Sequence, residues 1–183
     1  MHSKTPLAAL LAVPALIVGA ALGIAQIERL DLRQMVEPTR AENAVLGTIT
    51  AKQVFRVDHP VDGPELYFTR MTIQGKSLYD GSDLTAEVTF AGGFVSPNEG
   101  VHNSEAPSAD DTRIGNTVVA FYRWTNNMGG DVAGNALYAA HGGLFRVAKA
   151  GADQVVLGRG EGYAIARNVR VPVLEAEIRE LRR

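Results

Sequence analysis

The chain contains no cysteine, and it has a single tryptophan among 183 residues. The lack of cysteine excludes disulfide bonds, a catalytic thiol, cysteine-ligated zinc, iron–sulfur centres and a lipid-modified cysteine anchor. Neither sign of charge is in large excess, since 20 acidic and 18 basic side chains leave a formal net charge of −2. Such a balance does not predict a nucleic-acid-binding protein, which carries a basic excess. The fold must therefore be held together by burial of apolar side chains.

Charged side chains are also absent from Thr5–Ile27, a run of 23 residues that follows a short positive end at Lys4. This order is typical of an export signal, because the positive end stays in the cytoplasm while the apolar helix enters the bilayer. As a helix, residues 6–25 would be about 30 Å long, enough to cross a membrane. Small residues around Gly23 also suit a signal peptidase. Two predictions stay open: a single-pass inner-membrane anchor with the C-terminal domain in the periplasm, or a cleaved signal that releases a periplasmic or secreted protein.

Behind this segment the apolar pattern changes to a period of two, which indicates strands. The stretch 117–125 is apolar on both sides, as expected of a central strand that is covered on both faces. Asp80–Gly81 predicts a tight turn, and residues 91–111 predict a long polar loop. The predicted strands are 43–50 and 52–57 (or one strand bent at Gly47), 66–74, 84–90, 117–125, 136–140, 144–148, 154–157 and 163–166.

Many short strands joined by glycine-rich turns, without alternating helices, predict an all-β fold. We expect a small antiparallel barrel, with a two-sheet sandwich as the alternative. A short C-terminal helix should follow, since Pro172 suits a helix start and Leu174, Ile178 and Leu181 form one apolar stripe. The predicted segments are 1–27 (anchor or signal), 28–42 (linker or short helix), 43–171 (β-domain) and 172–183 (C-terminal helix).

The near-neutral total hides an uneven distribution of charge. The stretch from residue 58 to residue 111 contains ten acidic residues but only two basic ones, Arg70 and Lys76. These acidic residues are either scattered over solvated loops or gathered into an acidic face that binds a basic partner or divalent cations. Whether they cluster in space distinguishes the two interpretations. The ten are Asp58, Asp62, Glu65, Asp80, Asp83, Glu87, Glu99, Glu105, Asp110 and Asp111.

No catalytic motif is evident, and we predict no catalytic residue, no metal site and no cofactor. The histidines of the β-domain, His59, His102 and His141, lack the paired spacing of metal ligands. The cluster of Asp58, His59, Asp62 and Glu65 lies among prolines and glycines, which indicates a turn. His141-Gly142-Gly143 resembles a lipase oxyanion loop, but the chain has no Gly-x-Ser-x-Gly elbow. The glycines of 158–162 fit a hairpin turn better than a dinucleotide fingerprint.

The aromatic residues are more informative as a surface. Trp and Tyr are favoured at the centres of protein interfaces, and Trp124 lies beside a polar turn on the same strand side as Tyr122. The alternative is that Tyr122 and Trp124 are packed in the core or fill the end of the barrel. The candidate partner-contact residues are Tyr122, Trp124, Asn126, Asn127, Met128, Glu99, His102 and Glu105.

Several short segments recur in the same order in another group of proteins. They are 30–33, 43–50, 88–93, 114–121 and 143–147, which include a strand ending in Gly-Gly and a Gly-x-Phe-x-Val strand. In this arrangement the chain resembles exported bacterial β-domain proteins of unassigned function. The resemblance implies a β-domain and no particular reaction.

Three functions remain at this stage. The first is a non-enzymatic accessory or scaffold subunit, anchored through Thr5–Ile27, that docks on a larger membrane protein complex. The second is a cleaved, soluble periplasmic or secreted protein that holds a small ligand in the barrel mouth. The third is a hydrolase that uses an Asp or Glu together with His59. The sequence favours the first, because it has a leader long enough to span, a long polar loop and no reactive constellation.

Overall fold

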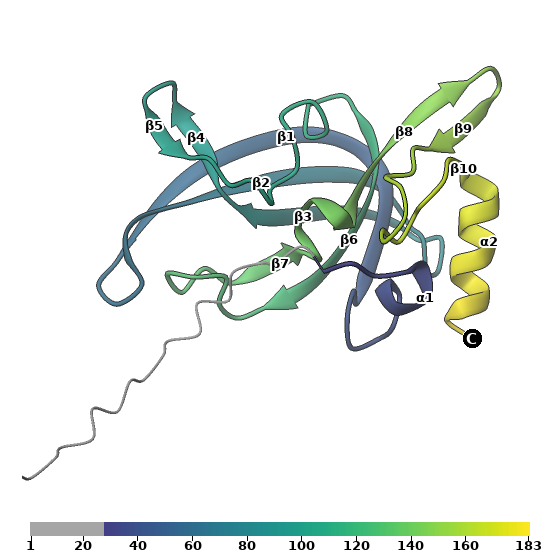
Figure 1. The fold of residues 1–183 in the computed structure, drawn as a ribbon, viewed down its shortest axis with the longest axis horizontal. Helices are drawn as coiled ribbons and strands as arrows, with labels where there is room; N and C mark the ends of the chain where they lie inside the picture. Colours follow the sequence, from purple (N-terminus) through teal and green to yellow (C-terminus); the bar gives the residue numbers. More distant parts are fainter. Residues whose placement is uncertain (1–27) are drawn as a thin grey trace, which may run out of the picture.

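The computed structural model describes residues 28–183, so the predicted anchor or signal segment lies outside the described residues. The described chain forms a β-barrel with an attached hairpin and two helices (Figure 1). Its elements are α1 Leu32–Met35, β1 Asn43–His59, β2 Gly63–Ser77, β3 Asp83–Ala91, β4 Gly93–Ser96, β5 Glu99–Val101, β6 Thr117–Thr125, β7 Gly134–Leu137, the 3-10 turn Ala140–Gly143, β8 Leu144–Ala150, β9 Asp153–Val156, β10 Val169–Arg170 and α2 Val171–Leu181.

Five strands close the barrel in the order β1-β2-β3-β7-β6, and β6 returns to β1. All neighbours are antiparallel except β3 and β7, which are parallel. This order is that of the five-stranded Greek-key barrel known as the OB-fold. The strands β8, β9 and β10 continue the sheet from β6 beyond the barrel. The prediction of a small barrel is thus confirmed, and the sandwich alternative is wrong.

Two hydrophobic clusters lie on opposite faces of the sheet. The barrel interior holds Val118, Ala120 and Tyr122 of β6 together with side chains of β1, β2 and β3. The other face of β6 presents Val119 and Phe121 to the cluster beneath the two helices. The predicted central strand is therefore covered on both faces, as its sequence indicated.

A glycine pair allows β1 to bend. Residues Val45 to Thr48 of β1 pair with β2 on one edge and with β6 on the other, so the strand coils sharply as it closes the barrel. Gly47 and Gly75 are register partners, and a Cβ on Gly75 would lie only 2.0 Å from the carbonyl oxygen of Leu46. The predicted strands 43–50 and 52–57 form one bent strand, the second of the two alternatives.

The helices cover the face of the sheet opposite the barrel interior. Asp31 and Gln34 form a reciprocal capping box that begins α1. Helix α2 begins at Val171, one residue before the predicted start, and buries Leu174 and Ile178. Within residues 28–183 no helix combines the length and the apolar character needed to cross a membrane.

Two local predictions are wrong. Residues 163–166 are not a strand: Ala164 and Ile165 are apolar because they are buried in the outer cluster, not because they belong to a ladder. The predicted loop 91–111 contains the β4–β5 hairpin, whose strands pair only with each other.

Candidate functional site: a groove at the β3–β7 seam

A groove of about 980 Å³ opens at the seam between β3 and β7. The aromatic and aliphatic part of its lining includes Tyr67 and Phe68 of β2, Phe90 of β3, and Leu137 and Tyr138 of the β7 end. The polar and charged residues of the lining are Glu28, Asp62, Glu65, Thr89, His102, Asn103, Ser104, Arg123, Thr125 and Asn127. The groove therefore combines an apolar floor with a polar rim.

The seam itself is held by little backbone pairing. All four residues of β7 pair with β6, but only Ala136 pairs with β3, at Thr89. On either side of this pair, side-chain amides bind the carbonyl oxygens of β3. Asn135 Nδ2 donates to the Glu87 oxygen at 3.1 Å, and Asn103 Nδ2 donates to the Ala91 oxygen at 3.1 Å. These amides satisfy a strand edge that would otherwise need a partner strand.

One wall of the groove consists of the β1–β2 and β6–β7 turns, which are bonded to each other. The backbone N–H of Gly130 donates to Asp62 Oδ2 at 2.7 Å, and His59 Nε2 lies 3.1 Å from Asp131 Oδ2. His59 Nδ1 accepts the N–H of Asp62 at 3.0 Å, so its other nitrogen is the one that donates to Asp131. His59 therefore fastens two turns together.

The opposite wall begins at the β4–β5 hairpin. Figure 1 shows this hairpin and the β1–β2 turn projecting from the same side of the barrel, opposite α2. The hairpin carries Phe94, Val95 and Val101, three of the exposed large apolar side chains of the described chain. Next to the hairpin turn, Oε1 of Glu99 accepts a hydrogen bond from the hydroxyl of Tyr67 at 3.3 Å.

The first described residue, Glu28, also lines the groove. Its carboxylate accepts hydrogen bonds from Arg40 and from the Tyr138 hydroxyl, the latter at 3.0 Å. Arg40 and then Tyr138 lower the pKa of Glu28, against the opposing effect of burial. Arg123 covers the ring of Tyr138 at 5.2 Å. The uncharged segment 5–27 is thus joined to the domain at the groove.

The loop between β5 and β6 completes the wall and is held in two places. Near the groove, the backbone carbonyl of Glu105 accepts both the N–H and the ring Nδ1 of His141, at 2.9 and 3.1 Å. His141 is bonded at its other nitrogen to the Tyr163 hydroxyl, at 3.1 Å. Ala139 and Ala140, which precede His141, both have left-handed backbone angles. Such conformations persist where surrounding contacts impose them.

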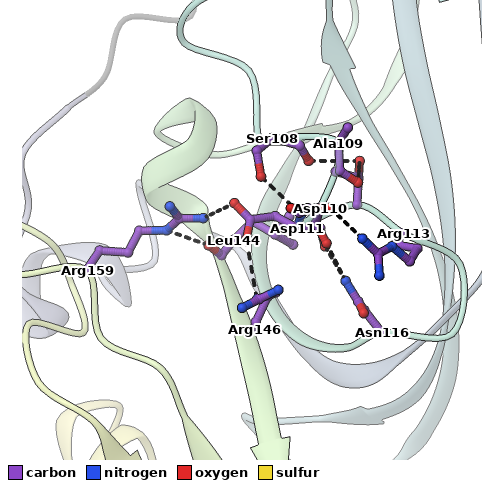
Figure 2. Close-up of polar contacts among 10 residues, drawn as sticks. Ser108, Ala109, Asp110, Asp111, Arg113, Asn116, Leu144, Arg146 and Arg159 are labelled. Atoms are coloured by element: carbon purple, nitrogen blue, oxygen red, sulfur yellow. Dashed lines mark hydrogen bonds and ion pairs between the residues drawn. The ribbon is translucent and has the colours of Figure 1, made fainter.

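Farther along, Asp111 anchors the same loop to the sheet (Figure 2). Arg159 Nη2 donates to Asp111 Oδ2 at 2.9 Å, and Arg159 Nε donates to the Leu144 carbonyl at 3.0 Å. Arg146 lies 3.6 Å from the other carboxylate oxygen. Burial acts to raise the pKa of Asp111, but the bonds from Arg159 and Ser108 outweigh it, so the pKa is lowered. This anchor is structural, because its groups are bonded to one another.

The structure separates the ten acidic residues of 58–111 into groups. Asp80 and Asp83 lie at the β2–β3 turn, and Asp110 and Asp111 pair with arginines of the loop anchor. Glu87 lies near Arg70, and the backbone carbonyl of Glu105 is bonded by His141. Asp62 and Glu65 line the groove, Asp58 and Glu99 share Arg56 with Glu65, and Asp131 of the β6–β7 turn shares His59 with Asp62. Of these five carboxylates, Asp58, Glu65 and Glu99 lie within 3.6 Å of the Arg56 guanidinium, and Asp62 and Asp131 lie beside the imidazole of His59. The five, which we call the acidic rim, are Asp58, Asp62, Glu65, Glu99 and Asp131.

The predicted partner-contact residues fall in different places. Asn127, Met128 and His102 line the groove, and Glu99 lies beside it. Tyr122 is buried in the barrel interior, whereas Trp124 is 56% exposed and donates through Nε1 to Asn126. Glu105 contributes its backbone carbonyl, and its Oε2 atom is buried without a hydrogen-bond partner in the described structure. Glu28, Asn103, Arg123 and Tyr138 also line the groove, and no sequence pattern had singled them out.

Two histidines of the groove walls are engaged in hydrogen bonds between loops. His59 and His141 are each bonded at both ring nitrogens, by turn residues, an aspartate and a tyrosine, and neither is bonded to a serine or threonine hydroxyl. Across 28–183 no three His, Asp or Glu side chains are grouped so that they could hold a metal ion. The groove offers apolar contact area, strand-edge carbonyls that are bonded by side-chain amides, and carboxylates.

Comparisons with protein-family models, with curated proteins and with solved structures find no match to this chain.

Proposed function

We propose that this protein is a non-catalytic accessory subunit, held at the outer side of the cytoplasmic membrane by Thr5–Ile27, whose groove docks a segment of a larger membrane protein complex. The observation that carries this proposal is the open groove flanked by exposed apolar side chains. Large apolar residues grouped on a polar surface mark interaction sites. Phe94, Val95 and Val101 lie together on one hairpin beside the groove.

The position of Glu28 supports a partner in or at the membrane. Since Glu28 lines the groove and directly follows Ile27, a retained membrane anchor would hold the groove within a few residues of the bilayer surface. A partner segment that emerges from the membrane would then meet the groove first.

The alternative of a small ligand has one observation in its favour. A volume of about 980 Å³ is at the upper end of the range for small-molecule pockets. A small ligand would leave the exposed hairpin residues without a role, and for this reason we favour a protein segment.

Co-purification from membranes solubilised in a non-ionic detergent tests the proposal. The full chain should retain Met1 and elute with partner subunits, and Val101→Ser should reduce the recovered partner. Val173→Ser on α2 is the matched control, because Val173 is 55% exposed and Val101 45%, and it lies on the opposite side of the domain (Figure 1). Recovery of the chain alone would contradict the proposal, and a mature N-terminus near Ile24 or Gln26 would favour the soluble alternative.

A further inference from the structure

Resting on the proposed function, we infer that the groove recognises an extended polypeptide segment in which lysine or arginine alternates with apolar side chains. Three properties of the groove lead to this partner: the charge of its rim, the chemistry of its floor and the strand edges that form its walls.

The acidic rim selects for positive charge. Arg56 lies 3.0 Å from Asp58, 3.5 Å from Glu65 and 3.6 Å from Glu99, so three carboxylates share one guanidinium. This surface therefore has negative charge in excess of its own cations, and a cationic partner would complete it.

The same charge argues against a polyanion. In OB-type barrels the face of the second and third strands, with the adjacent loops, binds oligonucleotides or oligosaccharides. Here Asp62 and Glu65 line that region, and phosphate groups would be repelled by them. A nucleic acid or an anionic lipid headgroup is thus a poor occupant of this groove.

The floor selects for apolar side chains. Phe68 is stacked on Phe55 with ring centroids 5.7 Å apart, and Leu137 and Phe90 continue the apolar surface. Apolar side chains on one face of a bound segment would cover this floor, while the other face would carry the charges toward the rim.

The walls select for an extended backbone. Beyond the single Thr89–Ala136 pair, β3 and β7 are not paired to each other, and the Ala91 carbonyl accepts a hydrogen bond from the side chain of Asn103. An incoming strand could take over such edge groups, which is how extended peptides add to exposed sheets. A residue pattern with a period of two is the pattern of such a strand.

Peptide binding to the full chain in non-ionic detergent micelles tests this inference. Three short labelled peptides alternate valine with lysine, glutamine or glutamate, and binding is followed by fluorescence anisotropy. The lysine peptide should bind at least about tenfold more tightly than the glutamine peptide, and the glutamate peptide should bind weakest. Raising the salt from about 0.1 M to about 1 M should remove most of this difference, because the screening length falls from about 10 Å to about 3 Å.

The double variant Glu65→Gln/Glu99→Gln locates the effect. Each lost charge should weaken lysine-peptide binding roughly twofold to fivefold, and the pair about tenfold. The control Glu177→Gln/Glu180→Gln removes the same charge from exposed positions on α2 and should leave binding unchanged. A circular dichroism spectrum equal to that of the unmodified chain shows that each variant is folded.

The outcomes distinguish this inference from the proposed function. The inference is wrong if the glutamine or glutamate peptide binds as tightly as the lysine peptide, if no peptide binds, or if the two double variants behave alike. Any of these results can occur while co-purification still depends on Val101, and then the accessory function stands with a partner of other chemistry. If the chain elutes from membranes alone, the function itself fails.

Discussion

The Asp111 anchor allows a quantitative test of how the groove wall is held. Asp111→Asn keeps the shape of the side chain and one neutral acceptor, but it removes the charge that faces Arg159. The side chains of Asp111 and Arg159 are only 17% and 23% exposed, so solvent screens their interaction weakly. A hydrogen bond to a charged group contributes about 1.5–3 kcal/mol. Because the amide retains part of this bond, we expect a loss of about 2 kcal/mol in the free energy of unfolding.

The neighbouring residue supplies the matched control. Asp110 pairs with Arg113 at 2.5 Å, but these side chains are 72% and 69% exposed. Exposed pairs contribute about 0–1 kcal/mol. Asp110→Asn should therefore change stability far less than Asp111→Asn, although both remove one carboxylate from the same loop.

Thermal unfolding followed by circular dichroism measures both variants. For a chain of this length, a loss of about 2 kcal/mol lowers Tm by roughly 4–8 °C. The pH dependence gives a second readout with a defined sign. Because the folded pKa of Asp111 is lowered, its contribution is present above the unfolded pKa of about 3.9 and is lost as the pH falls through the lower folded value.

The difference between the unmodified chain and Asp111→Asn should therefore shrink in acid, below a pH of about 4. Equal losses for Asp110→Asn and Asp111→Asn, or a difference that persists unchanged in acid, would refute the assignment of the anchor to this ion pair.

Two further predictions concern the barrel and the C-terminal helix. Gly75→Ala places a Cβ 2.0 Å from the Leu46 carbonyl oxygen and should cost at least about 2 kcal/mol in denaturant unfolding, whereas Gly81→Ala meets no neighbour and should cost about 1 kcal/mol from its left-handed backbone alone. Burial raises the pKa of Tyr79 to about 12, so its contribution to stability is complete below pH 10 and is lost as the pH rises through about 12. In an ultraviolet titration, Tyr79→Phe should remove one late-titrating tyrosine, and an unchanged titration curve would contradict the assignment.

The strands that could be predicted from the sequence are those in which each face stays either apolar or polar along the whole strand. Residues 117–125 are apolar on both faces because one face lies inside the barrel and the other lies under the helices. The hairpin β4–β5 was missed because its strands are short and exposed, and Gly93 and Gly100 have backbone angles unusual for strands. Residues 163–166 were wrongly predicted to be a strand. A buried loop segment can be as apolar in sequence as a buried strand, because burial alone selects apolar residues.

The groove was less predictable than the barrel. The acidic stretch 58–111 was evident in the sequence, and so was the question of whether its charges cluster. The answer depends on the turns that His59 joins, and on Asp131, which lies outside that stretch. Glu28, Asn103 and Tyr138 come together only because β3 and β7 are parallel neighbours, a pairing that local sequence patterns do not encode.

The two sides of the barrel differ in how their backbone groups are satisfied, and this difference is the reason why we propose the seam as the binding edge. Between β1 and β6 six successive residue pairs join the strands, so an incoming chain would have to break native pairing there. At the β3–β7 seam, by contrast, the strands are joined by one residue pair, and the side-chain amides of two asparagines bind the carbonyl oxygens of β3. A side-chain amide such as that of Asn103 can rotate away from its carbonyl without unfolding any strand, because only rotamer changes are needed. Binding at the seam therefore exchanges a side-chain hydrogen bond for a backbone one, and the rest of the barrel keeps its hydrogen bonds.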